Sequence, residues 1–528
     1  MPIKKPFIIS IVLMGFATTF MLAASLCATG GEFTYAMDDA YIHLAIAKNL
    51  ADYGLWGVNR FAESSASSSP LWIFILSFFG LFMDRGTLVH VPFTLNFIFQ
   101  AAALFFASGT LERIGADEKK SGIHLVLAAA AAGFPALTFV GMEHSLQIAL
   151  CVMLLNATID HADSGSRESA IRLSLVSALL LFARYDSVFI IASCAIVLLF
   201  NKRFFAAAAA PLAAMAPVFV FGALSVAGGH YFVPTPIVRK MISSVTHHNS
   251  TLFSFLAGTN AFYNMKTDPG IFALIAACLA ALIFAAKRFG KSTGPVNLLA
   301  ACLGAALLHV FGSELSGGLF RYSAYIVFVC VIALSGAPEG LMTTAARLHS
   351  LKRTAVVAFA AAVSLCLAWR ALQVTGIPVF ATKNIRQQQM QIALYLRDNM
   401  AGRGVAANDI GAISYFSDVR LLDLVGLASD EITELNRDHA FSADRVFSLI
   451  KRDGVELAVV YENWFKYLEL PVRGIRVAEW EIGNNKICSS EKVSFFCLDK
   501  KRLSEHLRTI EDFSKNKLPK DVSWKIFK

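Results

Sequence analysis

Apolar segments of about 20 residues recur along most of this chain, and short charged links separate them. A helix of that length crosses the hydrocarbon core of a bilayer, so the segments predict membrane spans. Of the 528 residues, 56% are hydrophobic and 16% are charged, whereas an ordinary soluble domain has about 25% charged residues. The sequence therefore predicts a polytopic α-helical membrane protein.

The segments predict about eleven spans, the first of which reads as an uncleaved span rather than a signal peptide. The run "PLWIFILSFFGLFM" (Pro70–Met83) is short for a span, and we expect it to be re-entrant or interfacial. The predicted spans are at about 7–28, 91–111, 121–140, 145–161, 170–184, 186–201, 204–227, 269–286, 295–312, 322–338 and 354–373.

The links between spans sort by charge, because cytoplasmic loops collect lysine and arginine. The basic or mixed links are predicted to be cytoplasmic: the N-terminus and residues 112–120, 165–169, 201–203, 287–291 and 346–353. The remaining links then face outward: the first outer loop (29–90) and residues 141–147, 184–186, 228–267 and 313–322. If the run Pro70–Met83 crossed the membrane, this alternation would fail.

The last part of the chain has frequent charges and no segment of span length. Short apolar runs such as "VELAVVYE" alternate with helical ones, which predicts a small extracytoplasmic α/β domain. We therefore divide the chain into a transmembrane domain (1–383) and a soluble domain (384–528). Asp409 follows a predicted strand, where such folds place ligand groups, and acceptor binding and a scaffold role both stay open. Cys488 and Cys497 form either a hairpin disulfide or two free thiols.

The net charge of +9 does not indicate nucleic-acid binding, because most basic residues flank apolar segments and orient the chain. The nine cysteines show no CxxC spacing typical of a metal site. No Walker A motif or other Gly-rich nucleotide loop is present. A membrane-held, already activated donor would remove the need for a bound nucleotide.

The ionisable residues that flank the spans gather on the predicted outer face. Ionisable groups at span ends are typical of a site or a pathway. They are Asp38, Asp39 and His43 on the first outer loop, Glu143 and His144 on the second, Arg184 and Asp186 on the third, Arg239 and Lys240 on the fourth, and Glu314, Arg321 and Tyr322 on the fifth.

Asp38 and Asp39 begin a predicted amphipathic helix, "DDAYIHLAIAKNL". One carboxylate suffices to cap a helix, so the second is available for chemistry such as general-base catalysis. The outer cations suit a phosphate leaving group. Each group also has a simpler interpretation: Arg184 and Asp186 as a structural ion pair, for example, or Arg239 and Lys240 as contacts to lipid headgroups.

Taken together, "DDAYIHLAIAKNL", "SSPLW" (Ser68–Trp72), "GMEHSL" (Gly141–Leu146), "RYD" (Arg184–Asp186) and later segments up to about Ser429 resemble the GT-C superfamily of membrane glycosyltransferases. The similarity is greatest to bacterial arabinofuranosyltransferase-like members. "RYD" stands where Arg-Pro-Glu is more usual, and no proline follows Tyr322 closely.

The resemblance implies a GT-C fold, a polyprenyl-phosphate-linked sugar as donor, and transfer on the periplasmic face of the bacterial inner membrane. The sugar would be arabinofuranose, and the acceptor an envelope glycan, a glycolipid or a surface protein. Some family members need a divalent metal ion and others do not, so a metal stays open. The implied roles are a catalytic base for Asp38, with Asp39 second; donor-phosphate binding for Arg239, Lys240 and Arg321; and substrate binding for His43, Glu143, His144, Arg184, Glu314 and Tyr322.

Two other classes of function compete with this one. A lipid-linked sugar transporter or flippase would place its charged residues near mid-membrane on internally repeated helices, and we find no repeat. A structural envelope protein would leave the aspartate pair without a function. The depth of the carboxylates in the membrane discriminates between transferase and transporter.

Overall fold

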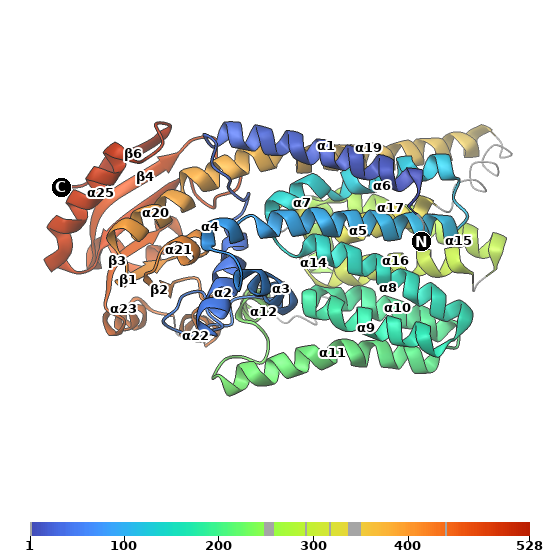
Figure 1. The fold of residues 1–528 in the computed structure, drawn as a ribbon, viewed down its shortest axis with the longest axis horizontal. Coiled ribbons are helices and arrows are strands. Elements are labelled where there is room, and N and C mark those ends of the chain that lie inside the picture. The colour runs from blue at the N-terminus through green and yellow to red at the C-terminus, as the bar shows by residue number, and fades with distance from the viewer. Residues whose placement is uncertain (1–2, 248–257, 291–292, 316–317, 336–349, 439–440) are drawn as a thin grey trace.

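The computed structural model shows an elongated molecule, with helices running lengthwise in a bundle and an α/β domain at one end (Figure 1). It describes residues 3–247, 258–290, 293–315, 318–335, 350–438 and 441–528. Parts of five predicted segments lie outside the described residues: 248–257, 291, 316–317, 336–338 and 346–349.

The bundle is built from apolar helices that expose large apolar side chains, such as Phe16, Leu212 and Leu365, on its surface. Within the described residues, eight helical segments are long and apolar enough to cross a membrane. Three further predicted spans, 170–184, 186–201 and 322–338, correspond to the shorter helices α9, α10 and α17. The helices of the bundle are α1 (Lys5–Ala28), α5 (Val91–Arg113), α6 (Glu118–Ala132), α7 (Phe134–Val140), α8 (His144–Ser164), α9 (Arg167–Ala183), α10 (Val188–Phe200), α11 (Phe204–Ala227), α15 (Pro269–Phe289), α16 (Gly294–Gly312), α17 (Ala324–Ser335) and α19 (Ser350–Gln387). The prediction of a multi-pass helical membrane protein is confirmed.

The described parts of the two sets of links sorted by charge lie at opposite ends of the bundle. At the end away from the α/β domain, Lys4 pairs with Glu112 at 2.5 Å, Arg113 pairs with Asp160, and Arg203 donates to a carbonyl at the end of α8. The helices of the first outer loop, α2 (Asp39–Tyr53), α3 (Pro70–Gly80) and α4 (Arg85–Leu88), lie at the domain end, as does α12 (Thr235–His247) of a later outward link (Figure 1).

Short helices cap the bundle at its domain end. They are α2 (Asp39–Tyr53), α3 (Pro70–Gly80), α4 (Arg85–Leu88), α12 (Thr235–His247) and α14 (Thr259–Thr267). The run predicted to be re-entrant or interfacial forms α3, which has 11 residues and packs on α2. At 1.5 Å per residue this helix is roughly 16 Å long, half of what a crossing requires.

The α/β domain, called the sheet domain below, has one six-stranded sheet in the order β2-β1-β3-β5-β4-β6. The first three strands in this order are parallel, and the rest are joined antiparallel. The predicted α/β character is confirmed; the boundary predicted at 383/384 falls inside α19 and stays a prediction. The elements are α20 (Gln389–Asn399), β1 (Gly404–Ala407), α21 (Gly411–Phe416), β2 (Arg420–Asp423), α22 (Asp430–Arg437), α23 (Ala443–Arg452), β3 (Val455–Val460), α24 (Leu470–Arg473), β4 (Ile475–Ile482), β5 (Lys492–Cys497), α25 (Leu503–Asn516) and β6 (Val522–Ile526).

Helices cover both faces of the sheet, because successive strand residues point to opposite sides. Leu457 and Val459 of β3 join the larger core, in which Trp480 stacks on Phe513 of α25 with ring centroids 5.7 Å apart. The intervening Ala458 and Val460 join a second core with residues of α22 and α23. Cys488 and Cys497 are free thiols, so the second of the two alternatives holds.

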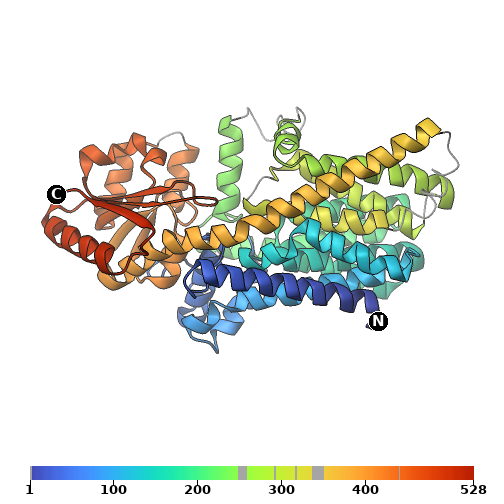
Figure 2. The ribbon, with the colours of Figure 1, turned by 90° about the horizontal axis from the view of Figure 1, so that it is seen from above.

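The sheet domain is joined to the bundle by a continuous helical path and by side-chain contacts. α19 runs from the far end of the bundle into α20, and Figure 2 shows it crossing the length of the molecule. The Asp430 carboxylate accepts from Thr235 Oγ1 at 2.8 Å and pairs with His230 at 2.5 Å. Arg60 pairs with Asp418 at 3.0 Å. These contacts hold the sheet domain against the end of the bundle.

Candidate active site

The carboxylate of Asp38 caps a helix of the sheet domain. Asp38 has helical backbone angles (φ −66°, ψ −31°), and its side chain makes no bond to its own helix α2. Its Oδ2 accepts the backbone N–H of Gly411 at 2.6 Å, and its Oδ1 accepts that of Ala412 at 2.8 Å. The first two N–H groups of α21 are otherwise without helical partners. Asp38 therefore anchors the first outer loop to the sheet domain.

A second carboxylate lies in the field of Asp38. Asp409, two residues after β1, accepts hydrogen bonds from Tyr461 Oη at 2.5 Å and from Gln389 Nε2 at 2.7 Å. Burial raises the pKa of Asp38 to about 7, and the charge of Asp409 adds to this rise. Burial raises the pKa of Asp409 as well. Near neutral pH the two groups together carry less than two negative charges.

Asp39 points to a different set of partners. Its Oδ2 accepts from Arg321 Nη2 at 2.7 Å. Its side chain is 37% exposed, and no described residue donates to its other oxygen. One oxygen of this carboxylate is thus available to a substrate, next to a guanidinium group.

Three cations surround the ring of Tyr322, and we call Arg184, Lys240, Arg321 and Tyr322 the cation cluster. The charged groups of Arg184, Lys240 and Arg321 lie 5.2, 4.4 and 4.8 Å from the ring centroid. The Tyr322 hydroxyl oxygen lies 3.2 Å from Lys240 Nζ and 3.1 Å from Arg321 Nη2. The three cations come from links far apart in the sequence. Arg184 and Arg321 are ion-paired to carboxylates, whereas Lys240 forms no ion pair with a described residue, and such an array of donors suits an anionic ligand such as a phosphate.

Buried acidic groups hold Arg184 in this cluster. Its Nε and Nη2 donate to Asp186 at 3.1 and 2.6 Å, while Nη1 contacts Glu143 and lies 2.9 Å from His144 Nε2. The ion-pair interpretation of Arg184 and Asp186 therefore holds in the structure. His43 Nδ1 lies 3.5 Å from Glu143 Oε2, so this histidine faces the buried network.

A strained turn presents Arg321 and Tyr322. Leu319 and Phe320 have φ angles of 60° and 55°, a region that costs a non-glycine residue about 1–3 kcal/mol. Arg370 of α19 holds this turn: it donates to Ser323 Oγ at 2.8 Å and to the Phe320 carbonyl at 3.3 Å.

The countercharge of Arg370 is Asp268, just before α15. The two side chains form an ion pair and are only 3% and 4% exposed. Sequence reasoning missed both residues, although an arginine inside the predicted span 354–373 is a recognisable signal. Gln389 and Tyr461, which bind Asp409, were also missed, because nothing in their local sequence distinguishes them from core residues.

Two other predicted site residues, Arg239 and Glu314, lie on the outward links. Arg239 is half-buried on α12, beside the exposed Lys240 that reaches Tyr322. Glu314 is exposed between α16 and the turn, and it forms no hydrogen bond or ion pair with a described residue. Its predicted substrate role receives no support from a contact.

A metal ion was left open by the sequence. In the part of the chain that the structure describes, no three His, Cys, Asp or Glu side chains are placed to hold one. Asp38 and Asp409 already accept hydrogen bonds from N–H or O–H donors, whereas one oxygen of Asp39 has no donor among the described residues. The question of a metal ion stays open, and the mechanism below routes no step through one.

Comparison with known proteins identifies the fold. A family model described as a domain of unknown function (DUF8728) matches residues 383–497. No curated protein matches the chain. The solved structure of ArnT from Cupriavidus metallidurans bound to undecaprenyl phosphate is similar, with a TM-score of 0.54 at 11% identity over 92% of this chain and 98% of that chain. The apo state of ArnT gives a TM-score of 0.51 at 10% identity with the same coverage. The chain thus has the GT-C fold, as predicted from its sequence.

Proposed function

We propose that this protein is a glycosyltransferase that moves a sugar from a polyprenyl-phosphate donor to an acceptor hydroxyl. The observation that carries this proposal is the cation cluster, three cations around Tyr322 with Asp39 ion-paired to one of them. The solved neighbour of the same fold bound to undecaprenyl phosphate supports a lipid-phosphate ligand.

The reaction follows from the positions of these groups. The acceptor hydroxyl oxygen attacks the anomeric carbon, and the bond from that carbon to the phosphate oxygen breaks. Polyprenyl phosphate leaves with the bonding electrons, and Arg321 and Lys240 stabilise its negative charge. The hydroxyl proton passes to the unoccupied oxygen of Asp39, the general base.

The geometry favours Asp39 over Asp38 as the base. Both oxygens of Asp38 accept backbone N–H groups of α21. Asp39 is ion-paired to a residue of the cation cluster, so its free oxygen lies next to where the anomeric carbon would sit. The earlier assignment of the base to Asp38 stays a prediction, and we propose a positioning role for Asp38 instead.

We place the reaction on the periplasmic face of a bacterial inner membrane, with the N-terminus cytoplasmic. The basic links at the far end of the bundle support this orientation. The site groups lie at helix ends rather than midway along the spans, which favours a transferase over a transporter. Arabinofuranose is our candidate sugar, and an envelope glycan, a glycolipid or a surface protein is the candidate acceptor.

The test is sugar transfer by purified protein from a panel of polyprenyl-phosphate sugars, followed by mass spectrometry. Asp39→Asn should lose about 100-fold or more of kcat, the usual contribution of a general base. Arg321→Met should weaken donor binding. Asp512→Asn, a change to an exposed carboxylate on α25, is the matched control and should leave transfer unchanged.

The outcomes separate the alternatives. Loss of transfer in Asp38→Asn with full activity in Asp39→Asn would move the base to Asp38. Full activity in both variants would remove the pair from catalysis. Absence of transfer from every donor, together with donor-dependent flipping in vesicles, would favour a transporter.

A further inference from the structure

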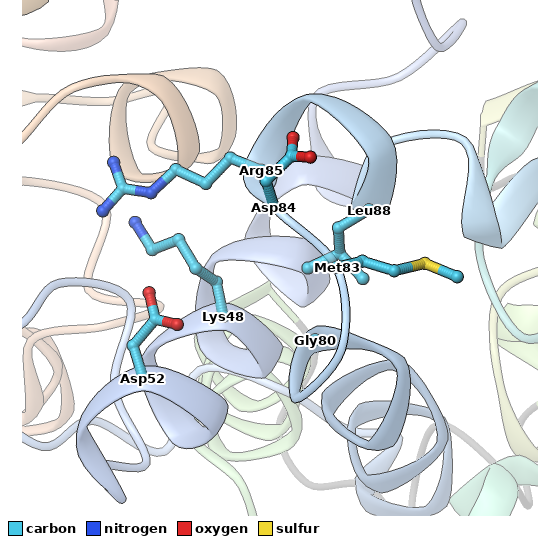
Figure 3. A pocket seen from close by; sticks show the side chains of 7 residues that line it. All are labelled: Lys48, Asp52, Gly80, Met83, Asp84, Arg85 and Leu88. Atoms are coloured by element: carbon cyan, nitrogen blue, oxygen red, sulfur yellow. The ribbon is translucent and has the colours of Figure 1, made fainter.

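A pocket of about 220 Å³ lies between α2, the end of α3, and α4 (Figure 3). It is lined by Lys48, Asp52, Gly80, Met83, Asp84, Arg85 and Leu88. Its volume is below the roughly 300–1,000 Å³ of pockets that enclose drug-sized ligands, so it suits a small polar group. Lys48 follows Asp39 by nine residues, which places it on the opposite face of α2 and roughly 13 Å further along the helix. The pocket is therefore separate from the cation cluster.

Lys48 is an unusual residue to line a pocket. Its side chain is 4% exposed, yet it forms no hydrogen bond or ion pair with any described residue. Its amine lies 5.9 Å from the ring centroid of Tyr415. Burial and, after it, the charge of Arg85 lower the pKa of Lys48 to about 8. The carboxylates of Asp418 and Asp52 offset this charge only in part, and a buried ammonium that no carboxylate contacts costs free energy, which an anionic ligand would relieve.

The other charged groups complete a zwitterionic lining. The side chain of Arg85 extends to the same side as that of Lys48, and the carboxylate of Asp52 lies beside Lys48 (Figure 3). The carboxylate of Asp84 is not available to a ligand, because it accepts hydrogen bonds from the N–H and the hydroxyl of Thr87, both at 3.1 Å. Asp418, which also acts on Lys48, is paired with Arg60. Two cations and one exposed carboxylate are thus left for a ligand.

Apolar surface adjoins this polar pocket. Phe78, Leu81 and Phe82, which lead into the pocket residues, are 59%, 61% and 73% exposed. One candidate membrane span begins at Arg85 itself. A ligand in the pocket would therefore have its polar group among charged side chains and its apolar part beside exposed aromatic rings, at the membrane boundary.

We propose that this pocket binds the headgroup of a glycerophospholipid, with the phosphodiester between Lys48 and Arg85 and, in phosphatidylethanolamine, the ammonium group on Asp52. The acyl chains lie along Phe78, Leu81 and Phe82. This lipid is a bound partner rather than a sugar donor or acceptor, so the inference does not depend on the proposed function.

The test is native mass spectrometry of the purified, delipidated full chain with phosphatidylethanolamine, phosphatidylglycerol or phosphatidylcholine. The wild type should retain phosphatidylethanolamine best. Lys48→Met and Arg85→Met should each retain it about tenfold less, because each removes a charge-assisted contact to the phosphate. Asp52→Asn should abolish the preference for phosphatidylethanolamine over phosphatidylglycerol. Lys287→Met, at the far end of the bundle, is the matched control and should bind like the wild type.

Thermal unfolding in detergent distinguishes a variant that has lost lipid binding from one that has failed to fold. Lys48→Met removes a buried unpaired charge and should be at least as stable as the wild type, but added phospholipid should no longer stabilise it. Equal retention of phospholipid by the wild type and Lys48→Met would overturn the proposal. Equal stabilisation of the wild type by inorganic phosphate would make the pocket a soluble-anion site and would also overturn it.

Discussion

Gly411 permits the contact between Asp38 and the sheet domain, and we expect Gly411→Ala to break it. A Cβ atom at this position would lie 2.0 Å from the Asp38 carbonyl oxygen and 2.8 Å from its Oδ2. Since an ordinary contact needs about 3.5 Å, α21 would have to retreat by roughly 1 Å or more. The two N–H donors, now 2.6 and 2.8 Å from the carboxylate, would move beyond good hydrogen-bonding distance.

The size of the effect follows from the bonds that are lost. Hydrogen bonds to charged groups contribute about 1.5–3 kcal/mol each, and partial solvation of the released carboxylate would return some of this. A net loss of about 3 kcal/mol for the pair corresponds to a roughly 100-fold increase in the opening of α21. The junction should therefore loosen while the rest of the fold persists.

Hydrogen exchange measures this opening directly. Amides of α21 should exchange about 100-fold faster in Gly411→Ala than in the wild type, while amides of β4 and β5 keep their protection. Gly483→Ala is the matched control, because a Cβ there meets nothing within 4 Å. Unchanged exchange in α21, or equal acceleration in both variants, would refute the view that Asp38 anchors this helix.

Two further predictions concern the buried charges. The pKa of Asp38 is raised from 3.8 to about 7, so Asp38 contributes to the free energy of unfolding at acid pH, and this contribution is lost as pH rises through 7. Asp409→Asn removes a like charge and should make this loss smaller, as measured by thermal unfolding from pH 5 to 8. Arg370→Met should cost about 3–5 kcal/mol, because it leaves Asp268 buried without a countercharge, and Arg370→Met/Asp268→Leu should recover much of the lost unfolding temperature.

The sequence predicted the fold class because span length and charge asymmetry are local properties. Each span can be read from about 20 neighbouring residues, and basic links sort to one end without any knowledge of packing. The convergence of Asp39, Arg184, Lys240 and Arg321 at one end of the bundle was predicted in outline for the same reason. The charge pattern could not predict which arginine pairs with which carboxylate, since a guanidinium group can pair with any carboxylate at the same end of the bundle.

The contacts that were missed join residues that are not neighbours in the sequence, over 20 to more than 300 positions. No pattern near Asp38 indicates that its partners are the amides of Gly411 and Ala412, because backbone N–H groups have no signature in a sequence. The local rule predicted that an aspartate before a helix caps that helix. In the folded chain a different helix end, brought close by the sheet domain, offers the donors instead.

The two adjacent aspartates, Asp38 and Asp39, thus bind different partners. Consecutive residues at a helix start point about 100° apart, so one side chain can face the cation cluster while the next faces the sheet domain. Asp39 pairs with Arg321 on one side, and Asp38 holds α21 on the other. Any movement of the sheet domain that shifts α21 acts on the residue bonded to Asp39. In the proposed transferase, an acceptor bound at the carboxyl ends of the parallel strands would in this way align Asp39, the proposed base, and this is the role we propose for the second carboxylate.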